Sequence, residues 1–281
     1  MLLYKAPELK PGYNRIVSPE NAPLKHLEFG RLLLDSKQSH QTGQDGREKA
    51  FCLFSGACQA EVRLPGAKPQ AFQLGPRADA FDGAPWALYV PRQAEVTLTA
   101  VGTCNMGVFF SDAPRDTQPV LVSPDKAKIG HPGAANWRRD VYTTLGNDVD
   151  CCRLLIGETL NMPGNWSSYP PHKHDELKPP GEFPLEEVYF FLLKPPTGFA
   201  LQIVYTGERD PEPIEDVYLL RDGDTVVLPK GYHPVVSAPG YTLFYLWALA
   251  GDERRYGAWS DDPKHAWVKS AEAIVKAAAS R

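Results

Sequence analysis

The sequence predicts an all-β protein built from barrels or sandwiches of short strands. Runs rich in Val, Leu, Phe and Tyr recur along its 281 residues, and 27 prolines and 23 glycines separate them. Apolar runs interrupted in this way are typical of antiparallel barrels and sandwiches. Helix-like periodicity is almost confined to the C-terminal KSAEAIVKAAASR, for which we expect a short packed helix or a frayed tail.

Two domains of similar build are expected. A chain of this length with 43% hydrophobic residues can bury one large or two medium cores. The first half contains the strand-like runs EKAFCLFSG, CQAEVRL, APWALYVP, AEVTLTAVG and CNMGVFFS, and the second half repeats the same order of events. We therefore predict an N-terminal barrel over residues 1–125 and a C-terminal barrel over 126–281, with residues 115–140 as the linker and the start of the second barrel.

Composition excludes several classes of protein. The net charge is −4 and the basic residues are scattered, which argues against nucleic acid as a partner. No apolar run reaches the roughly 18 residues of a spanning helix, and the start lacks the layout of a signal peptide, so no membrane partner is expected. Five cysteines without regular spacing are typical of buried thiols in a reducing compartment. These observations favour a cytoplasmic protein.

Four residues predict a metal site: His172, His174, Glu187 and His233. Together they supply three imidazole nitrogens and one carboxylate oxygen, a donor set that suits a divalent metal ion. One His-x-His pair alone is a weak signal, whereas the four residues together favour an enzyme with a metal.

Strand geometry explains how these side chains could converge. Successive side chains of a β-strand alternate between its two faces, so His172 and His174 point the same way while Lys173 points the other way. In the strand EEVYFFLL only one of the two glutamates can face the metal, and we choose Glu187. The turn PKG then lets His233 begin a return strand near the first motif.

The first half offers no matching set of ligands. When the two halves are aligned by the order of their strand-like runs and turns, Glu95 falls near the position of His233. No His-x-His precedes EKAFCLFSG. His26 and His40 are isolated, and His131 lies in a loop beside Pro132. We expect an N-terminal barrel without metal that packs against its twin.

The two motif regions resemble those of the cupin superfamily, in which a small β-barrel holds a metal. The segments GNWSSYPPHKHD, LEEVYFFL, DGDTVVLPKGYHP and PGYTLFYLWALAG resemble, more specifically, the family of 5-deoxy-glucuronate isomerases of myo-inositol catabolism. The resemblance is strong over residues 150–265 and looser before them. It implies two tandem cupin barrels (a bicupin of double-stranded β-helix, jelly-roll-like domains) with little helix, and His172, His174, Glu187 and His233 as the metal ligands.

Two departures from the wider family pattern stand out. Twelve residues, Asp175 to Glu186, separate His174 from Glu187 where most cupins have three or four, although this long segment fits the isomerase resemblance. Trp247 stands where the isomerase family leads us to expect an asparagine. Its indole either reshapes the substrate pocket or packs outside it.

The resemblance implies an aldose–ketose isomerase that converts 5-deoxy-glucuronate to 5-dehydro-2-deoxy-gluconate. One divalent metal ion per chain would act as a Lewis acid on substrate oxygens, and no organic cofactor is required. The donors do not distinguish zinc, manganese, iron or nickel. Tyr189 and Tyr245 are candidate catalytic residues, and Tyr232, Asp175 or a metal-bound hydroxide are alternatives for the general base.

A uronate substrate carries a carboxylate, which an arginine can bind through two parallel hydrogen bonds. The candidates near the motifs are Arg139, Arg153, Lys173 and Arg221. The sequence does not tell which of them points inward.

Two other functions remain open: an iron-dependent cupin dioxygenase, whose product would require oxygen, and a sugar-acid-binding cupin without catalysis, whose binding would survive metal removal. Exposed strand edges also allow a homo-oligomer of unspecified size.

Overall fold

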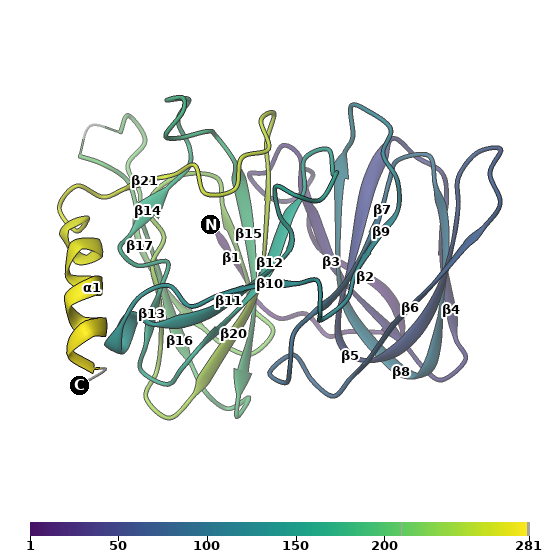
Figure 1. Cartoon of the computed structure of the whole chain (residues 1–281), viewed down its shortest axis with the longest axis horizontal. Helices are drawn as coiled ribbons and strands as arrows, with labels where there is room; N and C mark the ends of the chain where they lie inside the picture. The colour runs from purple at the N-terminus through teal and green to yellow at the C-terminus, as the bar shows by residue number, and fades with distance from the viewer. Residues whose placement is uncertain (209, 280–281) are drawn as a thin grey trace.

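Two β-barrel halves lie side by side in the computed structural model, which describes residues 1–208 and 210–279 (Figure 1). In both the purple-to-blue first half and the teal-to-yellow second half, the regular secondary structure is almost entirely β-strand. In the described part of the chain the helical elements are a 3-10 turn, η1 (Ala135–Trp137), and a helix, α1 (Trp267–Ala279). The predicted all-β class with little helix is confirmed.

The first half forms one eight-stranded sheet of order β2-β3-β8-β5-β7-β9, with β4 on β8 and β6 on β5. Its strands are β2 (Gly12–Val17), β3 (Glu28–Leu34), β4 (Ser39–Thr42), β5 (Arg47–Arg63), β6 (Gln70–Arg77), β7 (Trp86–Val90), β8 (Glu95–Asp112) and β9 (Val120–Val122). Four predicted strands merge into β5 and β8, because irregularities in pairing near Gly56 let each long strand bend without ending.

The second half has a seven-stranded sheet of order β1-β18-β15-β20-β12-β11-β10. Its strands are β1 (Leu3–Tyr4), β10 (Lys128–Gly130), β11 (Arg139–Leu145), β12 (Leu155–Asn161), β15 (Glu186–Lys194), β18 (Thr225–Leu228) and β20 (Thr242–Ala250). A second sheet contains β13 (Trp166–Ser167), β16 (Ala200–Tyr205), β17 (Glu215–Leu220) and β19 (Val235–Ser237), and a short ribbon pairs β14 (His172–Lys173) with β21 (Ser260–Asp261).

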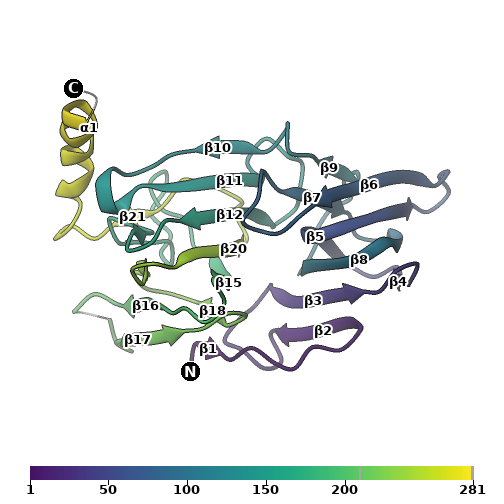
Figure 2. The same cartoon turned by 90° about the horizontal axis from the view of Figure 1, so that it is seen from below.

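The N-terminal residues cross to the second half. Leu3 pairs with Val226 and Tyr4 with Thr225, so β1 extends the sheet of the later barrel (Figure 2). Apart from this strand, the first half's paired strands end at Val122 and the second half's begin at Lys128. The domain boundary near residue 125 stays a prediction.

A shared apolar core joins the two halves. The ring of Phe190 on β15 lies 5.3 Å, between centroids, from both Phe29 and Phe54 of the first half. Beside this cluster, Arg77 of β6 donates two hydrogen bonds, of 2.9 and 2.7 Å, to the carboxylate of Glu158 on β12, and both side chains are buried. The interface is therefore packed like a protein interior.

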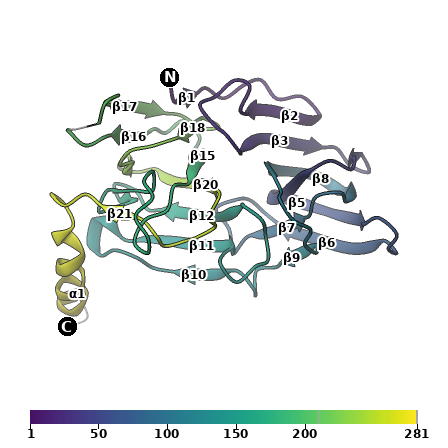
Figure 3. The ribbon, with the colours of Figure 1, turned by 90° about the horizontal axis from the view of Figure 1, so that it is seen from above.

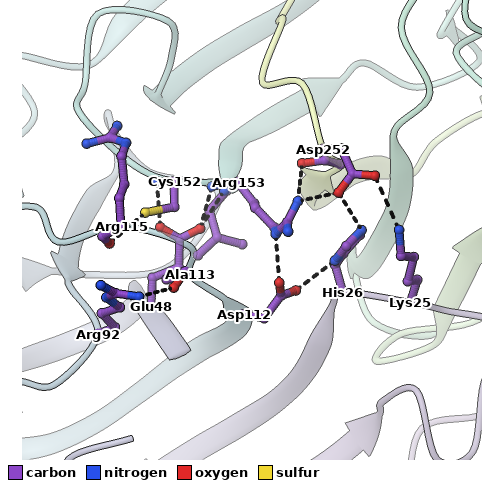
Figure 4. Close-up of polar contacts among 12 residues, drawn as sticks. Lys25, His26, Glu48, Arg92, Asp112, Ala113, Arg115, Cys152, Arg153 and Asp252 are labelled. Carbon is purple, nitrogen blue, oxygen red and sulfur yellow. Dashed lines mark hydrogen bonds and ion pairs between the residues drawn. The ribbon is translucent and has the colours of Figure 1, made fainter. Parts of the chain in front are cut away.

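Two glutamates, Glu48 and Glu186, join the halves through reciprocal contacts, and Glu48 is fully buried. The carboxylate of Glu48, on β5, accepts the backbone N–H groups of residues 152–154 at 2.7–2.8 Å. In the opposite direction Glu186, on β15, accepts the backbone N–H groups of residues 25–27 at 2.6–2.8 Å. Figure 4 shows the first of these contacts. Each half thus supplies one carboxylate and one set of amides, as in an isologous dimer contact.

Charged side chains close the rim of the same interface (Figure 4). Asp112 lies 2.7 Å from His26 Nδ1 and 2.9 Å from Arg153 Nε. Asp252 contacts the same two residues, at 3.8 Å from His26 Nε2 and 2.8 Å from an Arg153 guanidinium nitrogen. Each half supplies one basic and one acidic side chain.

The expected C-terminal helix is present as α1, which lies at the outer end of the second half, away from the first (Figure 3). Val268 is buried. Residues 280 and 281 of the expected segment lie outside the described residues. None of the described helices is long and apolar enough to cross a membrane. All five cysteines are free thiols, and four of them are buried as expected.

Candidate metal centre

The first motif lies at the mouth of the second barrel, where β14 pairs with β21. His172 and His174 line the same cavity, while Lys173 between them contacts Asp175 and Glu182 instead. This arrangement follows from the alternation of side chains along an extended chain.

The adjacent glutamates of β15 also face opposite ways. Glu187 and Tyr189 line the cavity, whereas Glu186 reaches the backbone of residues 25–27 in the other half. The geometry therefore favours Glu187 as the ligand and gives Glu186 a separate structural role.

A tight turn places His233. Gly231 has a φ of +93°, and a Cβ on it would come within 2.8 Å of the carbonyl oxygen of Tyr205, so both the conformation and the space require glycine. The Gly231 carbonyl oxygen lies 2.8 Å from His233 Nδ1 and fixes the ring with Nε2 toward the carboxylate of Glu187. The carbonyl oxygen of Leu185 holds His174 Nδ1 in the same way, at 2.7 Å.

Three of the predicted ligands converge. One donor atom each from His174, Glu187 and His233 lies within 4.8 Å of the others, and all three residues are buried. Glu187 Oε2 is 3.1 Å from His174 Nε2 and 3.3 Å from His233 Nε2. The Nε2 atom of His233 makes no hydrogen bond although it is buried. Such an orphaned nitrogen fits a metal ligand, because buried polar atoms otherwise find hydrogen-bond partners.

His172 stands beside this trio. Its ring centroid is 4.9 Å from that of His233 and 6.3 Å from that of His174. Its ring also stacks on Trp259 at 5.0 Å. The structure thus brings the fourth predicted ligand to the same cavity, outside the tightest cluster.

Burial and neighbouring charges set the histidine pKa values apart. Burial lowers the pKa of His233 to about 4, with the charge of Glu187 opposing the shift. Burial and the two other imidazoles hold the pKa of His172 well below its usual range. Burial alone would lower the pKa of His174, but its contact with Glu187 raises it. At neutral pH His172 and His233 are therefore neutral, the state that binds metal.

A cavity of about 390 Å³ opens beside the cluster. Tyr189 and Tyr245 line it, with ring centroids 4.8 Å apart. The hydroxyl of Tyr189 lies 3.0 Å from Ser168 Oγ, and that of Tyr245 lies 2.5 Å from Ser167 Oγ. Both predicted tyrosines thus belong to the cavity, whose size suits a small sugar acid.

Among the four basic residues predicted to bind a carboxylate, Arg139 lines this cavity. Its guanidinium donates to the carbonyl oxygens of Trp137 and Tyr169, at 3.3 and 3.0 Å. Among the described residues, Arg139 forms no ion pair with an acidic side chain. The structure places the other three elsewhere. Arg153 bridges the two halves, Lys173 contacts acidic side chains behind the first motif, and Arg221 packs over Phe199.

Trp247 lines the cavity. Its Nε1 donates to Thr159 Oγ1 at 3.2 Å, and its ring stacks on Tyr256 at 5.2 Å. A Cβ at Gly157 would lie 2.2 Å from the indole, so this glycine makes room for it. Sequence reasoning missed Tyr256 and Trp259, because they come from a loop after the last long strand whose path no motif indicates.

Comparison with known proteins gives a consistent picture. The sequence profile of the KduI/IolB family matches residues 2–268. The 5-deoxy-glucuronate isomerase of Geobacillus kaustophilus is 32% identical over 262 residues, which are 92% of each chain. That of Bacillus licheniformis is 32% identical over 269 residues, covering 94% of this chain and 96% of the relative.

Solved structures agree with this picture. An IolB-like protein from Salmonella typhimurium has a TM-score of 0.88 at 28% identity and covers 95% of this chain and 99% of its own. Oxalate decarboxylase of Lactobacillus farciminis has a TM-score of 0.69 at 11% identity, with 94% and 89% covered. The likeness to this bicupin enzyme confirms the predicted pair of tandem cupin barrels.

Proposed function

Because this chain belongs to the KduI/IolB family, we propose that it is a 5-deoxy-glucuronate isomerase acting in myo-inositol catabolism. The family resemblance seen in the sequence is confirmed, and the curated relatives described above carry the name of the predicted activity. The site supports the same conclusion, since it combines a metal-type donor set, hydroxyl groups and a cation in one small cavity.

The proposed metal centre consists of His172, His174, Glu187 and His233. The observation that carries it is the buried, unbonded Nε2 of His233 beside the carboxylate of Glu187. The Nδ1 atoms of His174 and His233 are held by backbone carbonyls, so their Nε2 atoms remain for a ligand. A divalent ion held there would supply Lewis-acid stabilisation of negative charge on the substrate oxygens.

Arg139 is the proposed partner of the substrate carboxylate. Its guanidinium lines the cavity, and the hydrogen bonds it donates end on backbone carbonyls rather than on carboxylates. Burial lowers the pKa of Arg139, which means that a bound anion would stabilise its charge. A carboxylate bound here fixes one end of the sugar acid while the other end faces the histidines.

The reaction requires two proton movements at adjacent carbons and no net oxidation. The proton on the carbon next to the aldehyde leaves, an enediol forms, and a proton is returned to the former aldehyde carbon. Burial raises the pKa of Tyr189 well above its usual range, so this phenol keeps its proton at neutral pH. Tyr189 can therefore donate a hydrogen bond to a substrate oxygen, and Tyr245 lies beside it.

A proton NMR time course tests the proposal. Metal-loaded protein is incubated with 5-deoxy-glucuronate in deuterated water under nitrogen, with a chelator-treated sample as control. We expect metal-dependent loss of the aldehyde signal, appearance of the ketose, and deuterium at the former aldehyde carbon. Turnover that begins only when air is admitted would indicate a dioxygenase instead, and binding without turnover would indicate a sugar-acid-binding protein.

A further inference from the structure

A folded loop, residues 175–185, connects the first histidine motif to β15, the strand that carries Glu187; we call this loop the insert. Its last residues return to its start, because Leu185 N donates to the carbonyl oxygen of His174 at 2.8 Å and the Leu185 carbonyl holds the His174 ring. Lys178 and Glu182 close its middle through two backbone hydrogen bonds of 3.0 Å. The insert is therefore built against a ligand side chain of the proposed centre.

Glu182 anchors the insert from inside. Its side chain has an exposed fraction of 0%, and its Oε1 accepts the backbone N–H groups of Asp175 and Glu176, each at 3.0 Å. The same oxygen lies 3.0 Å from Lys173 Nζ. Since Lys173 stands between the two histidines of the first motif, this carboxylate fixes that motif relative to the insert.

Asp175 extends the contacts to the second motif. One carboxylate oxygen pairs with Lys173, and the other accepts the backbone N–H of Gly231 at 2.7 Å. The carbonyl oxygen of Gly231 holds His233 Nδ1 at 2.8 Å. A continuous chain of polar contacts therefore runs from Lys173 through Asp175 and Gly231 to the ring of His233.

We propose that Asp175 is a positioning residue that sets the distance between the two histidine motifs and thereby the affinity for the metal. This role rests on the proposed metal centre. Asp175 acts through the backbone of Gly231: it accepts the N–H of this residue, and the carbonyl of the same residue orients a ligand ring. Asp175 contributes no donor atom itself. Residues that orient ligands from behind commonly change metal affinity about 10- to 100-fold when they are replaced.

Three substitutions separate this role from general support of the fold. Asp175→Ala removes both contacts, and we expect metal affinity to fall about 10- to 100-fold. Asp175→Asn loses the charge but keeps an oxygen for the Gly231 N–H, so its affinity should stay closer to that of the wild type. The side chain of Asp175→Ser is also too short to reach Gly231, so this variant should lose metal affinity to the same extent, and it replaces the alanine variant in the test if the alanine variant does not fold.

Glu176→Gln is the matched control. Glu176 belongs to the same insert and carries the same charge, but its half-exposed carboxylate contacts the lysines Lys178 and Lys173 and makes no contact with Gly231 among the described residues. We expect its metal affinity to equal that of the wild type.

The measurement is a titration of metal-stripped full-length protein with Zn²⁺ against a chromophoric chelator, with the visible spectrum of the Co²⁺ form and the Tm of the metal-free protein. Weaker binding and an altered Co²⁺ spectrum in Asp175→Ala or Asp175→Ser, with Asp175→Asn and Glu176→Gln near the wild type, support the proposal. Unchanged affinity in the alanine and serine variants, or equal loss in Asp175→Asn, overturns it. A wild type that binds no metal overturns the metal centre itself and this role with it.

Discussion

The two barrels use the same strand framework but fill it differently. In the first half Lys49 on β5 lies opposite Val90 and Phe110, and in the second half Glu187 on β15 lies opposite Leu228 and Leu249. The matching register makes Lys49 the counterpart of the proposed metal ligand. The ammonium group of Lys49 is fully buried and pairs with Asp45 at 2.8 Å.

The difference continues along the neighbouring strands. By register, Phe51 of the first barrel corresponds to Tyr189, and Val108 corresponds to Trp247. Phe51 and Val108 belong to the apolar core cluster of the first barrel, whereas Tyr189 and Trp247 line the cavity of the second. A few inward-facing positions on two strands therefore determine whether the interior of the barrel is filled by apolar side chains or contains a cavity.

The largest effect is expected from removing a proposed ligand. His174→Ala should lower metal affinity and turnover by more than about 100-fold, beyond the loss typical of residues that only orient a ligand. The fold should persist, because the strand core is apolar. Metal analysis, the NMR assay and circular dichroism check this, and retained turnover with unchanged circular dichroism would contradict the site. Glu187→Gln should behave likewise, and Glu186→Gln should affect turnover much less.

The interface between the barrels provides the next test. Arg77→Leu leaves Glu158 as a buried carboxylate without its bidentate partner, which should cost about 3–5 kcal/mol of unfolding free energy. Urea denaturation measures the loss. The double variant with Glu158→Leu should recover most of it, and a double variant as unstable as Arg77→Leu would show that the pair itself is not the cause.

Arg139→Gln sharpens the comparison within the second barrel. Loss of a carboxylate partner in a partly buried cavity should lower kcat/KM about 100-fold, or roughly 2.7 kcal/mol. Steady-state kinetics check this. Arg221→Gln is the control, since Arg221 packs over Phe199 away from the cavity, and an equal loss in both variants would remove Arg139 from its proposed role.

Metal binding should weaken on acidification. A metal binds neutral imidazole, so protons compete below the pKa of each free ligand. The pKa of His174 is raised from 6.5, so its competition begins above that pH, whereas those of His172 and His233 are lowered and compete only in more acidic solution. Each competing proton should weaken binding by about tenfold per pH unit. Chelator titrations between about pH 8 and 5.5 test this, and a flat profile would contradict it.

The smallest effect is expected at the counterpart position of the first barrel. Lys49→Met replaces a buried ion pair by an apolar side chain of similar length, while Asp45 stays partly exposed. Unfolding free energy should change by less than about 1.5 kcal/mol and turnover should not change. A loss of activity comparable to that of Glu187→Gln would show that the first barrel takes part in the reaction.

Local sequence patterns predicted much of the fold and the proposed site. The His-x-His spacing and the alternation along EEVYFFLL place His172, His174 and Glu187 at one cavity, because a strand fixes which side chains share a face. Aligning Val90 with Leu228, which pair with Lys49 and Glu187 in their own halves, keeps Glu95 at the position of His233; this correspondence stays a prediction.

Local sequence patterns do not show which side chains meet when segments far apart in the sequence pack together. Charge identified Arg139, Arg153, Lys173 and Arg221 equally, but only the folded chain shows that Arg153 bridges the halves while Arg139 lines the cavity. The contact of Glu186 with residues 25–27 joins segments far apart in sequence, which no periodicity reports.

The reciprocal clasp of Glu48 and Glu186 has a consequence for protein engineering. Cutting the chain near residue 125 would deprive each carboxylate of three amide donors and would separate β1 from β18. Unmet buried polar groups are costly, so neither barrel is a self-sufficient module to be transplanted. We therefore expect the two barrels to fold and unfold as one unit.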